Sequence, residues 1–256
     1  MAAHATPIEP DIDAEARRLL DLIAAQDLLA RLIGGMAIRL LAGPRLHPAY
    51  DRVVGDLDFL LPRRDGRAFE ALVTDAGYAP DEQFNTLNGH RRLLFYDEHH
   101  GRQIDGFVDS FEMCHRLPLS DRLTERDETL PAAEVLMTKL QIVDLNVKDR
   151  SDLYGLLLSH ETASHDDGAV NVERIAELTG NDWGLQHTFE LNLARLRDGL
   201  GEEPLEAPEA ETLRRRIDSL AEAMEAAPKS RRWRLRAKVG DRKRWYEEPE
   251  EVEREG

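Results

Sequence analysis

Two aspartates, Asp56 and Asp58, stand one residue apart in the segment DLDFLL, whose other residues are typical of a buried strand. Alternate side chains on a strand point to the same face, so the two carboxylates lie together while Leu57 and Phe59 point to the opposite face. Adjacent carboxylates repel each other and resist burial unless a cation neutralises them. Hard divalent ions prefer carboxylate oxygens, and Mg²⁺ takes one or two carboxylates together with substrate phosphates. The pair therefore predicts a site for Mg²⁺ or Mn²⁺, although a solvated surface strand would carry the same two acids without a cation.

A third carboxylate is expected from RQIDGFVD, residues 102–109, which reads as a second strand. Asp105 is flanked there by Ile104 and Phe107, whereas Asp109 is near the end of the strand. We therefore predict Asp105 as the third metal ligand, or as a group that helps to deprotonate an attacking hydroxyl. Two ions about 4 Å apart in such a cage would clamp the attacking and leaving oxygens of a phosphoryl displacement.

A diglycine, Gly34-Gly35, follows an apolar run and opens GMAIRLLAG, which reads as a short helix. A turn without Cβ atoms lets backbone N–H groups approach a phosphate, and the helix that follows offers its positive end. Arg39, one turn into this helix, would add a charge-assisted contact to the phosphate. A plain tight turn would also use two glycines, but the acidic pair on the next strand favours a phosphate cradle.

The order GG, DLDF, QID resembles the polymerase-β-like nucleotidyltransferase superfamily, which couples a glycine-rich strand-to-helix turn with an acidic pair and a later third acid. The matching residues are Gly34, Gly35, Asp56, Asp58 and Asp105. The resemblance implies an α/β (α+β) fold with a mixed sheet and flanking helices. It also implies Mg²⁺-dependent transfer of a nucleoside monophosphate from an NTP to a hydroxyl acceptor. The 20 residues between Gly35 and Asp56 exceed the usual interval, and the segment RLHPAYDRVVG accounts for the excess as a loop.

A lysine stands among apolar residues in the segment 131–148, which reads as one helix. Lys139 has apolar residues one turn before and one turn after it, and lysine is rare in such a stripe unless it is paired or snorkels to water. One interpretation is snorkelling. The other is that this face borders a cleft, where Lys139 neutralises the charge of nucleotide phosphates.

The segment KDRSDLYGLLL, 148–158, places Asp149 and Asp152 on one face of a helix. Together with Lys139 it resembles the second half of the AbiEii-type nucleotidyltransferases, the toxins of bacterial type IV toxin–antitoxin and abortive-infection systems. The resemblance implies functional roles for Lys139 and Asp152, RNA (especially the 3′ end of tRNA) as acceptor, and a cognate antitoxin as partner. The family's Arg-Asp-Leu-Tyr-Asp run is altered here, with Ser151 in place of arginine and Gly155 in place of the second aspartate.

Two other functions remain open at this point. A small molecule such as an aminoglycoside is an alternative acceptor, because related folds modify antibiotics and an acidic surface attracts polycations. The altered motif also admits a non-catalytic relative that binds a nucleotide or a partner protein.

The chain divides into three predicted parts: an α/β domain over 1–122, a helical domain over 123–228 and a charged tail over 229–256. Helical patterns in the second part cover 131–148, 150–160, 170–179, 184–198 and 208–226. In the tail, residues 229–244 hold nine Lys or Arg and one Asp, and residues 247–256 hold six Glu and one Arg.

The formal net charge of −16 excludes the whole body as a nucleic-acid-binding surface, so any RNA contact must be local. Residues 229–246 are the candidate, because Trp245 and Tyr246 add stacking surfaces to the basic residues. The alternation from Trp233 to Val239 suits a strand with one basic face, and a helix is also open. The other interpretation is that the basic stretch docks against the acidic body.

The composition predicts a cytoplasmic location. The sequence has one cysteine, Cys114, which excludes an intramolecular disulfide and a multi-cysteine zinc site. No apolar run approaches the length of a membrane span, and no secretory signal is expected at the N-terminus. A membrane partner is not expected.

Overall fold

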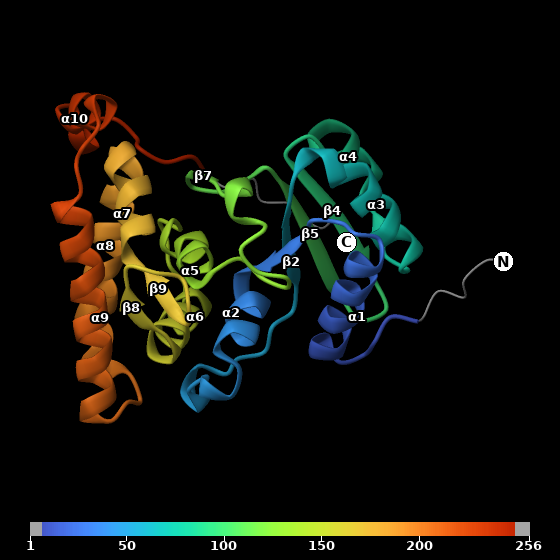
Figure 1. Ribbon diagram of the computed structural model, residues 1–256, viewed down its shortest axis with the longest axis horizontal. Coiled ribbons are helices and arrows are strands. Elements are labelled where there is room, and N and C mark those ends of the chain that lie inside the picture. The colour runs from blue at the N-terminus through green and yellow to red at the C-terminus, as the bar shows by residue number, and fades with distance from the viewer. Residues whose placement is uncertain (1–6, 249–256) are drawn as a thin grey trace. The chain divides into compact units, whose positions relative to one another are not determined.

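A computed structural model describes residues 7–248, which form two compact units (Figure 1). Unit 1 comprises residues 7–41, 53–111 and 118–131, and unit 2 comprises residues 42–52, 112–117 and 132–248. The expected mixed sheet with flanking helices, followed by C-terminal helices, is confirmed. The division differs from the predicted one in that segments 42–52 and 112–117 belong to unit 2 and segment 123–131 belongs to unit 1. The described part of the tail, residues 229–248, is included in unit 2.

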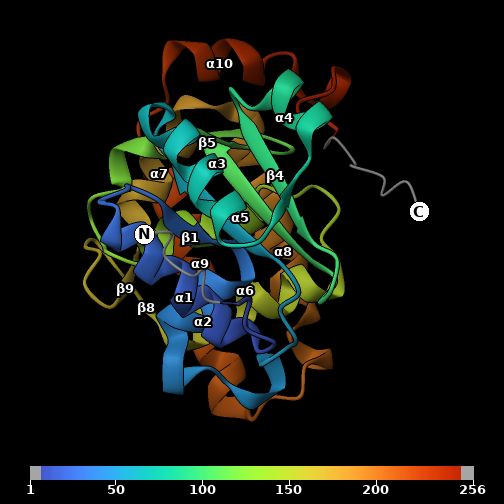
Figure 2. The same cartoon turned by 90° about the vertical axis from the view of Figure 1, so that its right-hand side faces the viewer.

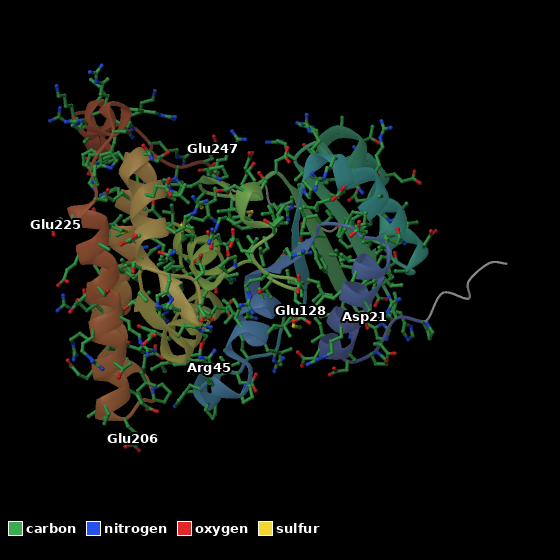
Figure 3. All side chains as sticks on the ribbon, viewed as in Figure 1. Asp21, Arg45, Glu128, Glu206, Glu225 and Glu247 are labelled. Carbon is green, nitrogen blue, oxygen red and sulfur yellow. The ribbon has the colours of Figure 1, made fainter. Side chains whose placement is uncertain are left out.

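The segment before residue 132 is tied to unit 1 by backbone hydrogen bonds. The N–H of Leu32 donates to the carbonyl of Glu128 (labelled in Figure 3) at 2.8 Å, and the N–H of Leu130 donates to the carbonyl of Leu32 at 3.2 Å. Leu123 and Leu130 are fully buried. The polar stretch that marks a boundary in the sequence therefore lies alongside the first strand rather than forming a free linker.

Unit 1 is built on a five-stranded sheet with the order β1-β2-β5-β4-β3. Its strands are β1 (Arg31–Ile33), β2 (Leu57–Leu61), β3 (Ala79–Pro80), β4 (Arg92–Asp97) and β5 (Arg102–Val108). β2 and β5 run parallel, and the other neighbours are antiparallel. The predicted strands of the DLDFLL and RQIDGFVD segments are confirmed.

The two faces of this sheet differ in character. Phe59 packs on Phe69, with ring centroids 5.5 Å apart, and Phe69 in turn packs on Phe95 at 6.3 Å. Phe69 belongs to α3 (Gly66–Asp75), which crosses in front of β5 and β4 in Figure 2. Gly106 of β5 makes this close approach possible, because a Cβ there would lie 3.0 Å from the Phe69 ring. The opposite face carries Asp58 and Asp105, since alternate residues point away from the apolar core.

Helix α2 (Gly34–Ala42) follows β1, and two further helices complete unit 1. They are α1 (Ile12–Ala25) and α4 (Glu82–Asn88). Buried Glu15 anchors α1, because it accepts hydrogen bonds from Arg18 (2.7 Å) and from the Tyr78 hydroxyl (2.8 Å). Its charge is therefore compensated inside the fold.

Unit 2 is predominantly helical. Its helices are α5 (Ala132–Leu140), α6 (Val147–Ser159), α7 (Val172–Asn181), α8 (Trp183–Gly199), α9 (Ala207–Ala226) and α10 (Arg231–Ala237). Its parallel strand pair is β8 (Glu161–Ala163) with β9 (Ala169–Asn171). Short strands β6 (Ser110–Glu112) and β7 (Arg116–Pro118) lie where the chain passes between units. Residues 231–237 are helical, so the helix alternative for the basic stretch is correct and the strand is wrong.

The prediction of one helix over 131–148 is wrong, because α5 ends at Leu140. The Asn192 side chain donates to the carbonyls of Leu140 (2.8 Å) and Ile142 (2.7 Å), and Arg195 donates to the carbonyl of Val143 at 2.7 Å. These bonds satisfy carbonyls that a continuing helix would have used. Asn146 then caps α6 in a reciprocal capping box with Asp149.

None of the helices within residues 7–248 has the length and apolar character needed to cross a membrane.

Buried His115 makes stability depend on pH. Its Nε2 lies 2.8 Å from the Thr188 hydroxyl, and burial lowers the pKa of His115 from 6.5 to about 4, although the charge of Asp182 opposes the shift. The unfolded chain binds the proton more tightly, so this contribution is fully present above pH 6.5 and is lost as pH falls from 6.5 towards 4. We expect a slope of up to about 1.4 kcal/mol per pH unit in that window.

Urea unfolding between pH 4 and 7 measures this slope. His115→Gln should flatten it, whereas His165→Gln, at an exposed histidine, should leave it unchanged. An unaltered slope in His115→Gln would contradict the assignment.

Candidate active site

The three predicted carboxylates belong to adjacent strands of unit 1. Asp58 is half-buried within β2 and pairs in register with Asp105 of the parallel strand β5. Asp105 is only 3% exposed. Asp56 is exposed and precedes the first residue of β2. The structure thus places Asp58 and Asp105 side by side on one face of the sheet, and it places Asp56 just before the start of β2.

The turn at Gly34 lies directly against Asp58. Gly34 has a φ of +65°, and its predecessor Ile33 pairs in register with Asp58. A Cβ at position 34 would overlap the Asp58 carboxylate and would lie 3.2 Å from its Cγ. Both backbone conformation and space therefore require glycine here. Gly35 continues into α2, so the positive end of this helix begins beside the Asp58 side chain.

Gly34→Ala tests this close approach. Gly101 of the β4–β5 hairpin is a matched control, because its φ is +67° and nothing lies within 4 Å of a Cβ added there. Gly101→Ala should cost only the left-handed strain, about 1–2 kcal/mol. Gly34→Ala should cost more and should also weaken Mn²⁺ binding, because Asp58 must move. Urea unfolding and Mn²⁺ titration measure the two effects, and equal behaviour of the two variants would contradict this reading.

Arg92 of β4 is a partner of Asp105 that our sequence reasoning missed. Its Nε donates to Asp105 Oδ1 at 2.6 Å, and Gln103 Nε2 donates to Oδ2 at 2.7 Å. The Arg92 guanidinium also lies over the Phe107 ring, 5.1 Å from its centroid. The arginine begins a strand whose next three residues are apolar, but its partner Asp105 depends on the register of β4 with β5.

The donor set fits a hard divalent cation. An ionised carboxylate offers about four lone-pair positions, so Arg92 and Gln103 orient Asp105 and still leave positions for an ion. Asp56 and Asp58 add further carboxylate oxygens of the type that Mg²⁺ prefers. In the part of the chain that is described, no three His, Cys, Asp or Glu side chains are gathered closely enough to hold a metal as they stand. Binding would require the carboxylates to converge.

Arg39 is paired within unit 1. Its Nη1 lies 3.4 Å from Asp13 of α1, and both side chains are partly exposed. The predicted contact of Arg39 with phosphate stays a prediction.

Lys139 and Asp152 are brought together in unit 2, as part of a four-residue ionic network. Lys139 Nζ lies 3.0 Å from both Asp149 Oδ1 and Asp152 Oδ2. Arg52 binds Asp152 through two hydrogen bonds of 2.8 and 2.7 Å. Burial disfavours the charged lysine, but the two aspartates outweigh burial and raise the pKa of Lys139. The network carries two positive and two negative charges, so the lysine is paired, and its predicted role towards phosphate stays a prediction.

The segment 43–52 explains one departure from the family motif. A Cβ at Gly155 of α6 would lie 3.0 Å from Leu46 and 3.3 Å from Tyr50. Tyr50 also packs on Tyr154, with centroids 5.5 Å apart. An aspartate at 155 would collide with this segment. Gly155 thus makes room for a segment that lies in the long interval between Gly35 and Asp56.

Other contacts hold the same segment on unit 2. Arg45 (labelled in Figure 3) lies 3.4 Å from the His160 ring nitrogen. The Tyr50 hydroxyl donates to Glu203 at 3.1 Å. Arg52, at the end of the segment, is the second cation that our sequence reasoning missed, because its partner Asp152 is 100 residues away.

No protein-family model and no curated protein matches this chain. The resemblance to nucleotidyltransferases therefore rests on the motifs and on the geometry described above.

Proposed function

We propose that unit 1 is a Mg²⁺-dependent nucleotidyltransferase that moves a nucleoside monophosphate from an NTP to a hydroxyl acceptor and releases pyrophosphate. The observation that carries this proposal is the contact between the Gly34 turn and Asp58, with Asp105 in register on the neighbouring strand. In this arrangement the glycine turn and the N-terminus of α2 lie beside two acidic side chains on one face of the sheet. The turn and the helix N-terminus suit phosphate groups, and the acids suit a cation.

Each residue has a role in this proposal. Asp56 and Asp58 hold the cation, and Asp105 either joins them or takes the proton of the acceptor hydroxyl. The backbone N–H groups at Gly34 and Gly35 bind the phosphates. When bound, the cation supplies Lewis-acid polarisation and neutralises the triphosphate charge. Arg92 orients Asp105 by donating to Oδ1.

Incubation of the protein with α-labelled NTPs, Mg²⁺ or Mn²⁺ and a panel of acceptors tests the proposal. We expect label on total RNA, or on an aminoglycoside if the acceptor is a small molecule, with pyrophosphate released in equal amount. Expression should correspondingly arrest growth, or confer drug resistance. An absence of label on every acceptor and of released pyrophosphate would overturn catalysis, and NTP binding without turnover would identify a non-catalytic relative.

The toxin-like version of the proposal includes a cytoplasmic location and a cognate antitoxin. Co-expression with the product of an adjacent small gene should relieve growth arrest. Arrest that persists with Asp58→Asn would argue that toxicity does not arise from transfer.

A further inference from the structure

A cavity of about 910 Å³ opens in unit 2, and all the residues that line it belong to this unit. Its lining comes from residues 114–116, the start of α8, α10 and the chain that follows α10. All three tryptophans of the protein and one tyrosine line it, together with several basic side chains. The aromatic residues are Trp183, Trp233, Trp245 and Tyr246.

Buried partners hold the aromatic residues in place. Trp245 Nε1 donates to the Thr188 hydroxyl at 3.0 Å, and Trp233 Nε1 donates to Gln186 at 3.1 Å. Gly184 allows the chain to approach α8, because a Cβ there would lie 2.7 Å from the Trp245 carbonyl oxygen. Hydrogen bonds and close packing against α8 thus fix the positions of Trp233 and Trp245 in the cavity wall.

The chain after α10 is fastened on both sides. Arg236 lies over the Trp183 ring, 4.7 Å from its centroid, and donates to the carbonyls of Gly240 (2.6 Å) and Lys243 (2.7 Å). Further on, the N–H of Glu247, labelled in Figure 3, donates to the Cys114 carbonyl at 2.9 Å. Arg236 therefore positions the residues that line the cavity, because its guanidinium contacts the Trp183 ring and two backbone carbonyls.

Other cations at the cavity are available to a ligand. Arg232 and Lys243 line it and are exposed, and neither forms an ion pair with a residue in the range 7–248. Arg244 is instead paired with Glu248. Of the two acids that line the cavity, Asp182 caps α8 by accepting from the Leu185 N–H at 3.1 Å, and Glu247 is exposed. A basic, aromatic cavity on a protein with a net charge of −16 is complementary to a local anionic ligand.

We propose that this cavity binds single-stranded nucleic acid. Bases stack on the partly exposed rings of Trp245 and Tyr246, and the backbone phosphates contact Arg232 and Lys243. The volume suits a ligand of nucleotide size. Flat aromatic faces beside cations favour this ligand over an acidic peptide, which would use the charges but not the rings. The site goes beyond the proposed transferase, because binding here uses no residue of unit 1.

Fluorescence anisotropy of the full-length protein with a labelled 12-nucleotide RNA tests the site. Arg232→Ala/Lys243→Ala should weaken binding about tenfold and reduce the slope of log K against log salt by about 1.4, since each single-strand phosphate contact contributes about 0.7. Tyr246→Leu should weaken binding at least about fivefold with an unchanged slope, because it removes stacking but no charge. Arg17→Ala/Arg67→Ala removes the same charge from exposed positions of unit 1 and should bind like the wild type.

The remaining arms separate the outcomes. Single-stranded DNA of the same sequence should bind, duplex RNA should bind more weakly, and Asp58→Asn should bind like the wild type. Urea unfolding of each variant excludes loss of the fold as the cause. Equal binding by Arg232→Ala/Lys243→Ala and its control would overturn the site, as would tighter binding of a polyglutamate peptide or no RNA binding at micromolar protein. Retained RNA binding without nucleotidyl transfer would overturn the proposed function and leave this site standing.

Discussion

Asp58→Asn is expected to lower the rate of nucleotidyl transfer at least about 100-fold, because it removes a charge aimed at the cation and the triphosphate. The substitution preserves the size of a half-buried side chain that the Gly34 turn contacts, so the fold should be retained. The rate of label transfer at saturating NTP and Mg²⁺ measures the effect.

Asp75→Asn is the matched control for this variant. Asp75 is an exposed residue at the end of α3 in the same unit, and its loss changes net charge by the same amount. We expect the control to transfer label at the wild-type rate. A fully active Asp58→Asn enzyme would contradict the assignment of Asp58 as a metal ligand.

Lys139→Met is expected to reduce the free energy of unfolding by about 3–5 kcal/mol, because it removes a cation that compensates two buried aspartates. Asp149 would lose its ion-pair partner, and Asp152 would keep only Arg52. Since the pKa of Lys139 is raised, its stabilising contribution is fully present below pH 10.5 and is lost only at higher pH. Urea unfolding at pH 7 measures the loss.

Lys148→Met supplies the comparison, because Lys148 is an exposed lysine on α6 of the same unit. Its replacement should change stability by less than about 1 kcal/mol. Wild-type stability in Lys139→Met would show that the network of Lys139, Asp149 and Asp152 is not what holds α5 to α6.

Residue patterns within single elements predicted the strands that carry the acidic residues and the turn at the diglycine. Alternation along DLDFLL and RQIDGFVD predicted which residues of β2 and β5 share a face, and the parallel register places Asp58 beside Asp105. The diglycine predicted a strand-to-helix turn, and the structure shows that Gly34 has no room for a side chain. The strand and helix patterns depend on neighbours within a few residues, whereas the β2–β5 register and the contact of Gly34 with Asp58 join segments far apart in the sequence.

Contacts between distant segments were not predictable in the same way. The helix over 131–148 is interrupted because Asn192, some 50 residues on, captures its carbonyls. Likewise, the segment before Asp56 reads as a loop, but its Arg52 binds Asp152 and its Tyr50 packs against α6. Hydrophobic periodicity carries no information about which distant side chain will satisfy a polar group.

The structure also gives a physical reason for Gly155, which in the sequence is only a difference from the AbiEii-type motif. Gly155 stands where the AbiEii-type motif that this segment resembles has an aspartate, and this difference alone would suggest lost function. Because the position is filled by Leu46 and Tyr50, the glycine accommodates an additional segment instead. Loss of activity cannot be inferred from Gly155.

A crystal structure with Mn²⁺ and a non-hydrolysable NTP would show whether Asp56 and Asp58 hold the cation. We expect an anomalous manganese peak coordinated by Asp56 and Asp58, with the triphosphate against the N–H groups of Gly34 and Gly35. A nucleotide bound elsewhere, or one bound with no manganese at these two carboxylates, would contradict it.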